Sequence, residues 1–200
     1  RKGAAKEKRD EAAGVLDAAK KDFEPFENMS RRDAKKAGQL NEFKEARSNL
    51  NSAQKAFDRA ESNYQQEVFF EGVVNQVLED FQNVNPEKFA EWDKFNPTGR
   101  GVIDIEVSAQ NVPIQMLDNK GFPTGRTTTE GINARIGSNN NDYVKVRLQV
   151  VRVDGVVKIQ AMTSVLVHGL GHVDGGKHRD EDYAVDYQIK NYDNFRKKKK

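Results

Sequence analysis

The strongest constraint on the fold is a run of apolar residues in the first third of the chain, spaced three and four residues apart. Apolar residues at alternating steps of three and four form a narrow stripe along one face of an α-helix, as in coiled coils. The run consists of Phe43, Ala46, Leu50, Ala53, Phe57, Ala60 and Tyr64. A second, shorter stripe precedes it and consists of Ala12, Leu16, Ala19, Phe23 and Phe26.

Signals between the two stripes predict a break in the helix. Pro25 cannot continue a helix, because it has no backbone N–H and its ring clashes with the preceding turn. Ser30 followed by Asp33 resembles a capping box, which starts a new helix. We therefore predict an antiparallel helical hairpin over residues 1–66, although the helices could also pack on the rest of the protein. The seam and partner contacts are expected at Leu16, Phe23, Phe43, Leu50, Phe57 and Tyr64.

The remainder of the chain predicts a body in which helices precede strands. Residues 67–95 carry apolar residues at helical spacing, with Pro86 near the start of a short helix. After Gly101 the apolar residues alternate with polar ones, and Asp154-Gly155 supplies a hairpin turn. We expect an α+β fold class: the helical hairpin, then a body over residues 67–195 with an antiparallel β-sheet over 101–168 packed on the 67–95 helices.

All three histidines fall in one glycine-rich stretch, at His168, His172 and His178. Their spacing resembles the metzincin zinc-peptidase pattern H-E-x-x-H-x-x-G-x-x-H over these eleven residues only. The resemblance implies a zinc site made of the three imidazoles. Gly169 stands where that pattern has its glutamate, which acts as general base, so a peptidase could not take a proton from zinc-bound water in the usual way.

Two other interpretations of this stretch compete with a peptidase site. One is a non-catalytic metal site using His168 and His172 with His178 or a nearby acid. The other, which the β-branched residues Val165 and Val167 favour, continues the preceding strand into a glycine-rich loop that merely carries the histidines. The acidic run Arg179–Asp182 that follows is interpreted as a solvated turn, because it lacks the alternating ligands of a calcium loop.

The composition limits the classes of function. With 33 basic and 31 acidic residues the net charge is +2, which gives no overall field for holding a nucleic acid. The chain has no cysteine, so disulfides and thiolate chemistry are excluded. No stretch reaches the roughly 18 apolar residues of a transmembrane segment. A basic tail over 196–200 could still attach to nucleic acid or an anionic surface; it consists of Arg196, Lys197, Lys198, Lys199 and Lys200.

The leading hypothesis from the sequence is a non-enzymatic structural or protein-interaction component of a larger assembly, with no cofactor. The projecting hairpin would contact protein partners or other subunits, and the α+β body would anchor it. The alternative is a zinc-binding, metzincin-like and degenerate metallohydrolase domain that uses His168, His172 and His178.

Overall fold

The chain divides into two compact units. The computed structural model describes residues 1–93, 103–108, 114–117, 123–128, 136–138, 144–150, 152–153, 156–172, 174 and 179–198. The first unit spans Arg1–Gly72 and the second Val73–Lys200. The boundary falls inside the long helix α3 (Leu40–Val84), so one continuous helix contributes to the cores of both units.

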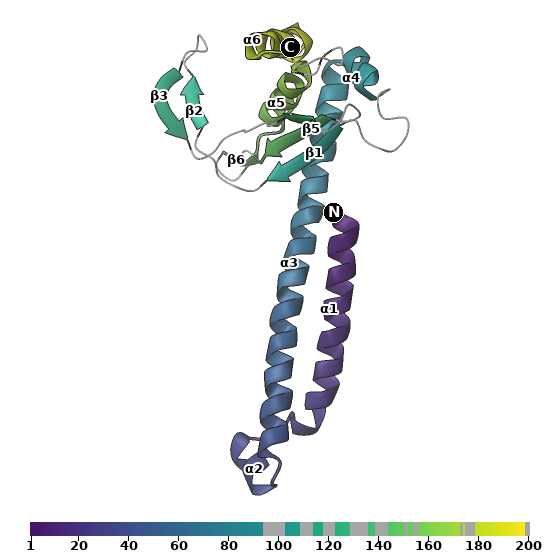
Figure 1. Ribbon diagram of the computed structural model, residues 1–200, viewed down its shortest axis with the longest axis vertical. Coiled ribbons are helices and arrows are strands. Elements are labelled where there is room, and N and C mark those ends of the chain that lie inside the picture. The colour runs from purple at the N-terminus through teal and green to yellow at the C-terminus, as the bar shows by residue number, and fades with distance from the viewer. Residues whose placement is uncertain are drawn as a thin grey trace. The chain divides into compact units, whose positions relative to one another are not determined.

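The first unit is a helical hairpin. Helix α1 (Lys2–Phe23) runs antiparallel to α3, and α2 (Arg31–Lys36) lies at the turn between them (Figure 1). As predicted, the chain leaves the α-helix at Pro25, which lies in a single 3₁₀ turn, Glu24–Phe26. Ser30 caps α2: its hydroxyl accepts the backbone N–H of Asp33, and the Asp33 carboxylate accepts the N–H of Ser30.

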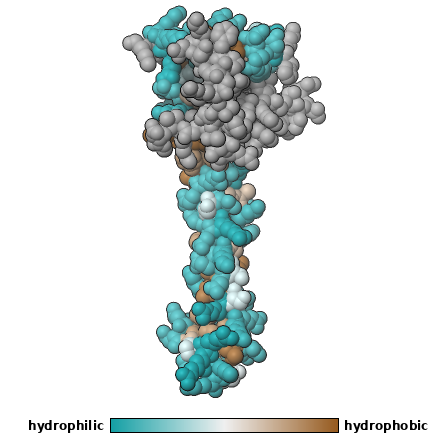
Figure 2. All heavy atoms as spheres, turned by 90° about the vertical axis from the view of Figure 1, so that its left-hand side faces the viewer, coloured by the Kyte–Doolittle hydropathy of each residue, from teal (hydrophilic) through white to brown (hydrophobic). Residues whose placement is uncertain are grey.

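Apolar side chains inside the hairpin form two clusters. Near the turn, the rings of Phe23, Phe26 and Phe43 lie 5.9–6.3 Å apart around the buried Ala34. Farther along, Leu16 packs with Ala19, Ala53, Leu50 and Phe57. Tyr64 lies beyond both clusters, where the Arg9 guanidinium covers its ring at 4.5 Å. The face of the hairpin visible in Figure 2 is mostly hydrophilic, as expected when the apolar residues face the seam.

The second unit is built around helices. Its core joins the end of α3 with α4 (Pro86–Asp93), α5 (Ile159–Gly171) and α6 (Glu181–Gln188). A π-helical turn, Ile189–Asp193, and α7 (Asn194–Lys198) follow α6 without a break. The largest fully buried side chains of this core are Tyr192, Phe81, Leu148, Met162, Leu166 and Leu170.

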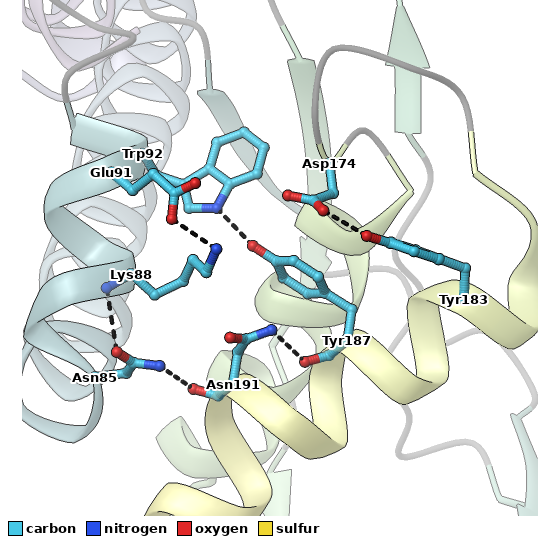
Figure 3. Close-up of polar contacts among 8 residues, drawn as sticks. All are labelled: Asn85, Lys88, Glu91, Trp92, Asp174, Tyr183, Tyr187 and Asn191. Carbon is cyan, nitrogen blue, oxygen red and sulfur yellow. Dashed lines mark hydrogen bonds and ion pairs between the residues drawn. The ribbon is translucent and has the colours of Figure 1, made fainter.

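Buried polar contacts connect α4 to the C-terminal helices (Figure 3). Asn85 caps α4, since its Oδ1 accepts the N–H of Lys88 at 3.1 Å, and its Nδ2 donates to the backbone carbonyl of Asn191 at 2.8 Å. The indole N–H of Trp92 donates to the hydroxyl of Tyr187 at 3.0 Å. Because buried polar groups are costly unless they are hydrogen-bonded, these contacts fix how α4 packs in the second unit.

The predicted α+β body with one antiparallel sheet is wrong, because the described residues are mostly helical. The strands form only small pairings: β1 (Ile103–Ser108) runs parallel to β5 (Val144–Gln149), and β4 (Ile136–Ser138) joins β5 from its other side. The pairs β2–β3 (Ile114–Leu117, Pro123–Thr128) and β6–β7 (Arg152–Val153, Val156–Val157) are separate and antiparallel. The last pair flanks Asp154-Gly155, which itself lies outside the described residues.

The prediction of a strand leading into a glycine–histidine loop is also wrong for residues 159–171. They form α5, because Met162, Thr163, Leu166, Val167 and Leu170 recur at helical spacing and are all buried. Val165 and Val167, which favoured a strand, pack instead in the core that α5 forms with the end of α3. Tertiary burial therefore overrides local β-propensity here.

Candidate metal centre

Helix α5 brings two of the three histidines together. His168 lies in its last turn and His172 is its C-cap residue, so the two imidazoles share one face of the helix. Their Nε2 atoms are 3.2 Å apart, and the rings meet edge to face at 82°. The side chains are largely buried, with 17% and 19% exposed. A strand would hold residues 168 and 172 too far apart for their imidazoles to meet.

A carboxylate from the next helix completes the cluster. Glu181 is the first residue of α6, which Asp180 caps by accepting the N–H of Tyr183 at 2.9 Å. The Oε1 atom of Glu181 lies 3.3 Å from Nε2 of His168, and its Oε2 lies 3.3 Å from Nε2 of His172. Two imidazole nitrogens and one carboxylate therefore converge, with the Glu181 side chain 72% exposed and reachable from solvent.

Close packing of α5 against α6 makes this convergence possible. A Cβ atom on Gly171 would lie 2.9 Å from Cα of Ala184 and 3.0 Å from Cβ of Tyr187. Carbon atoms in contact normally lie about 3.5–4.0 Å apart. Only glycine at this position lets the end of α5 approach α6 closely enough for Glu181 to meet both imidazoles.

Backbone contacts set the orientation of His172. Its Nδ1 lies 3.0 Å from the carbonyl oxygen of Arg179, while the N–H of Arg179 donates to the carbonyl of His172 at 2.7 Å. A carbonyl only accepts hydrogen bonds, so Nδ1 carries the proton and Nε2 of the neutral ring presents its lone pair to Glu181 and His168. This is the tautomer that a metal bound at Nε2 requires.

Burial favours the neutral form of His168. Burial lowers the pKa of His168, and the neighbouring His172 lowers it further, whereas Glu181 and a hydrogen bond with Gln188 raise it. The net shift of the pKa is downward from the ordinary value of 6.5. A neutral imidazole can bind a metal cation without first releasing a proton.

A second set of contacts beside the cluster joins Asp174, Arg179 and Tyr183. The hydroxyl of Tyr183 donates to Oδ2 of Asp174 at 2.5 Å, as Figure 3 shows, and the Arg179 guanidinium covers the Tyr183 ring at 4.7 Å. Nε of Arg179 also donates to the carbonyl of Asp174 at 3.4 Å. These contacts hold Arg179, whose carbonyl orients His172.

Two of the three histidines expected as metal ligands lie in the described part of the chain. His168 and His172 come together, whereas His178 lies outside the described residues. Gly169 is buried within α5, in the place of the glutamate of the zinc-peptidase pattern. Sequence reasoning missed Glu181, which belongs to a helix and not to a solvated turn. The available signal was Asp180, an N-cap residue that places Glu181 at the start of α6.

The other predicted site residues lie elsewhere. The six seam residues belong to the hairpin, where Phe43 and Leu16 are 3% and 4% exposed. Arg196, Lys197 and Lys198 belong to α7, and Lys199 and Lys200 lie outside the described residues. No helix in the described ranges is both long and apolar enough to span a bilayer. Comparison with protein families, with curated proteins and with solved structures finds no match.

Proposed function

We propose that this protein binds one zinc ion through His168, His172 and Glu181. The observation that carries the proposal is the spacing of the donor atoms, 3.2 Å between the two nitrogens and 3.3 Å from each nitrogen to a carboxylate oxygen. Donors bound tetrahedrally at the usual zinc distances lie about 3.3 Å apart. The two nitrogens, and each nitrogen with the carboxylate oxygen nearest to it, therefore have the spacing of neighbouring donors around one zinc ion.

The chemistry of the cluster favours a cation over a purely internal contact. With the Nδ1 proton of His172 directed at Arg179, a neutral His172 points an Nε2 lone pair at an anionic carboxylate, which is repulsive. A cation between the three donors turns this repulsion into attraction. Two imidazoles and one carboxylate are also a known zinc donor set that keeps a fourth position for water or another ligand.

The proposed zinc ion suits a role in the protein's architecture better than a role in peptide hydrolysis. It would connect the end of α5 to the start of α6, next to the close contact at Gly171. Position 169 is glycine, so the side chain that takes a proton from zinc-bound water in the zinc-peptidase pattern is missing from this helix. We therefore propose a zinc-binding module. It shares the two imidazoles and one carboxylate of some zinc hydrolases, but it lacks the glutamate that accepts the proton of zinc-bound water.

The test is metal analysis of protein purified without a histidine tag, followed by zinc titration monitored by calorimetry. The wild-type protein is expected to bind about one zinc per chain, and His172→Ala and Glu181→Ala are expected to lose this binding. Asp182→Ala is the matched control, because Asp182 is exposed, adjacent in sequence and not part of the cluster. Absence of stoichiometric zinc binding, or equal binding by Glu181→Ala, would contradict the proposal.

We also propose a second role, a protein contact made by the hairpin. A groove of about 610 Å³ runs between α1 and α3, with Ala4, Ala5, Ala56 and Ala60 in its lining. The cationic side chains that line it include Lys8 and Arg59, so it suits an acidic amphipathic helix. The probe is a fluorescent helical peptide of leucine and glutamate. Binding should be lost in Arg59→Glu and kept in Arg32→Glu, which changes α2 instead.

A further inference from the structure

A pocket away from the metal centre lies between the start of α5 and the C-terminal helices. Its larger part is a hollow of about 620 Å³, and a smaller hollow of about 270 Å³ adjoins it, since Gln160, Asp193 and Arg196 line both. We call the two together the C-terminal pocket. Pockets of this size that are largely apolar, with a few polar groups, are typical of small-molecule sites. The apolar part of this lining consists of Val156, Val157, Ile159, Ala161 and Tyr192.

Three cationic side chains line the C-terminal pocket. Lys158 lies directly before α5, and Arg196 and Lys197 belong to α7. The ion pairs formed within the described part of the chain involve none of these three residues. The Arg196 guanidinium lies 5.8 Å from the centre of the Tyr192 ring. A ring face supplies no acceptor for the planar fork of a guanidinium, so this contact leaves the fork available to a ligand.

One carboxylate, that of Asp193, also lines the pocket. Its Oδ1 accepts a hydrogen bond from the hydroxyl of Ser164, and its Oδ2 accepts one from Nε2 of Gln188, both at 3.2 Å. The two oxygens are therefore bound to uncharged side chains, and the carboxylate opposes the cations only at a distance. Three cations and one carboxylate give the lining a net charge of +2, which a dianion would balance.

We propose that the C-terminal pocket binds a small organic phosphate. The phosphate group would be held by Lys158, Arg196 and Lys197, and the apolar part of the ligand would lie against the apolar lining near Tyr192. A phosphate monoester carries a charge of about −1.5 to −2 at pH 7, which matches the lining. Guanidinium groups bind phosphate oxygens through paired hydrogen bonds, and lysines act as point charges beside them. The proposal does not depend on zinc, because no ligand of the candidate metal centre lines this pocket.

The test uses naphthyl phosphate, a fluorescent probe with both an apolar ring and a phosphate group, and compares it with naphthol, which lacks the phosphate. Titrations contain EDTA, so that no metal ion carries the phosphate. Naphthol should bind at least about tenfold more weakly, and Arg196→Ala should weaken binding of naphthyl phosphate by about 10- to 100-fold, as expected for lost hydrogen bonds to a charged group. Lys190→Ala is the control, because Lys190 is an exposed cation of the π-helical turn that does not line the pocket, and it should leave binding unchanged. Equal binding of the two compounds, or wild-type affinity in Arg196→Ala, overturns the proposal.

A variant that should gain affinity separates recognition of charge from damage to the fold. Asp193→Asn keeps the size of the side chain and removes the charge that opposes the phosphate, so naphthyl phosphate should bind about threefold to tenfold more tightly. Since a damaged pocket does not bind more tightly, this variant decides the question even if Arg196→Ala does not fold. Unchanged or weaker binding by Asp193→Asn overturns the proposal.

Two further measurements identify the source of the phosphate and separate this pocket from the metal centre. Binding to vesicles that contain phosphatidic acid, without binding of naphthyl phosphate, would indicate a membrane surface and would also overturn the proposal. Glu181→Ala should bind naphthyl phosphate as the wild type does, because Glu181 belongs to the candidate metal centre and does not line the pocket. Loss of binding in Glu181→Ala would place the phosphate at the metal centre and contradict the assignment to this pocket.

Discussion

Replacing Gly171 with alanine is the sharpest test of how α5 and α6 pack. The added Cβ would lie 2.9 Å from Cα of Ala184, 3.0 Å from Cβ of Tyr187 and 3.2 Å from the carbonyl oxygen of Ala184. Two of these three atoms are backbone, so no rotamer change relieves the clash. The two helices must separate by about 0.6 Å to restore ordinary carbon contact.

The expected cost follows from two opposing contributions. Forcing an extra methyl group into a packed core costs about 1–3 kcal/mol. Alanine is a better helix former than glycine by about 1 kcal/mol in a helix interior, and by less at the last residue of α5. We therefore expect Gly171→Ala to lower the free energy of unfolding of the second unit by about 1–2 kcal/mol.

The assay uses the single tryptophan of the chain. Trp92 is 8% exposed and donates to Tyr187, so its fluorescence reports unfolding of the second unit, whereas circular dichroism follows both units. Urea titration of Gly171→Ala should move the fluorescence transition to lower urea. Gly14→Ala is the control: no described atom lies within 4 Å of its added Cβ in α1, so the hairpin should gain about 0.5–1 kcal/mol.

A Gly171→Ala protein as stable as the wild type, or more stable, would refute this reasoning, since that result would mean that α5 and α6 are not in tight contact. The variant should also bind zinc more weakly, because a shift of about 0.6 Å exceeds the tolerance of about 0.2 Å for metal-ligand distances. Unchanged zinc affinity together with the predicted destabilisation would show that the metal centre does not depend on the packing of these helices.

Burial and hydrogen bonding support three further predictions. Leu16 is 4% exposed, so Leu16→Ala should destabilise the hairpin by about 2–4 kcal/mol in urea titrations followed by circular dichroism. Its control is Val15→Ala, at a residue 60% exposed, which should change the stability by less than about 0.5 kcal/mol. Asn85→Ala removes a helix cap and a buried donor, and should cost the second unit about 2 kcal/mol by tryptophan fluorescence. Burial raises the pKa of Tyr187 and of Tyr192 above the ordinary 10.0, so unfolding releases protons and the stability of the second unit should fall as pH rises above 10, less steeply in Tyr192→Phe.

The hairpin could be predicted from sequence because its signals are local. A stripe of apolar residues with a repeat of three and four defines a helix face without reference to the rest of the chain. Pro25 and Ser30 act within one turn of the backbone, and both place helix ends where the structure has them. Local periodicity and capping thus sufficed for the first unit.

The second unit could not be read in the same way. Residues 156–167 mix apolar and polar side chains, and their pattern fits a buried helix as well as a strand until the packing partner is known. That partner is the end of α3, which contributes Val73, Val77 and Phe81 to the core from far away in sequence. Glu181 was missed for a related reason: its meeting with the imidazoles depends on the close contact at Gly171, which no spacing rule reveals.

The π-helical turn lets the C-terminal segment hold one extra residue within a continuous run of helix. It accommodates one residue more than an α-helix would between Gln188 and its partner Asp193. Deleting a single residue from this turn would allow a continuous α-helix, in which the aspartate would follow Gln188 by four positions and stay on the same face. The residues after the turn would keep their facing, so a one-residue deletion here should be tolerated better than the same deletion in the regular part of α6.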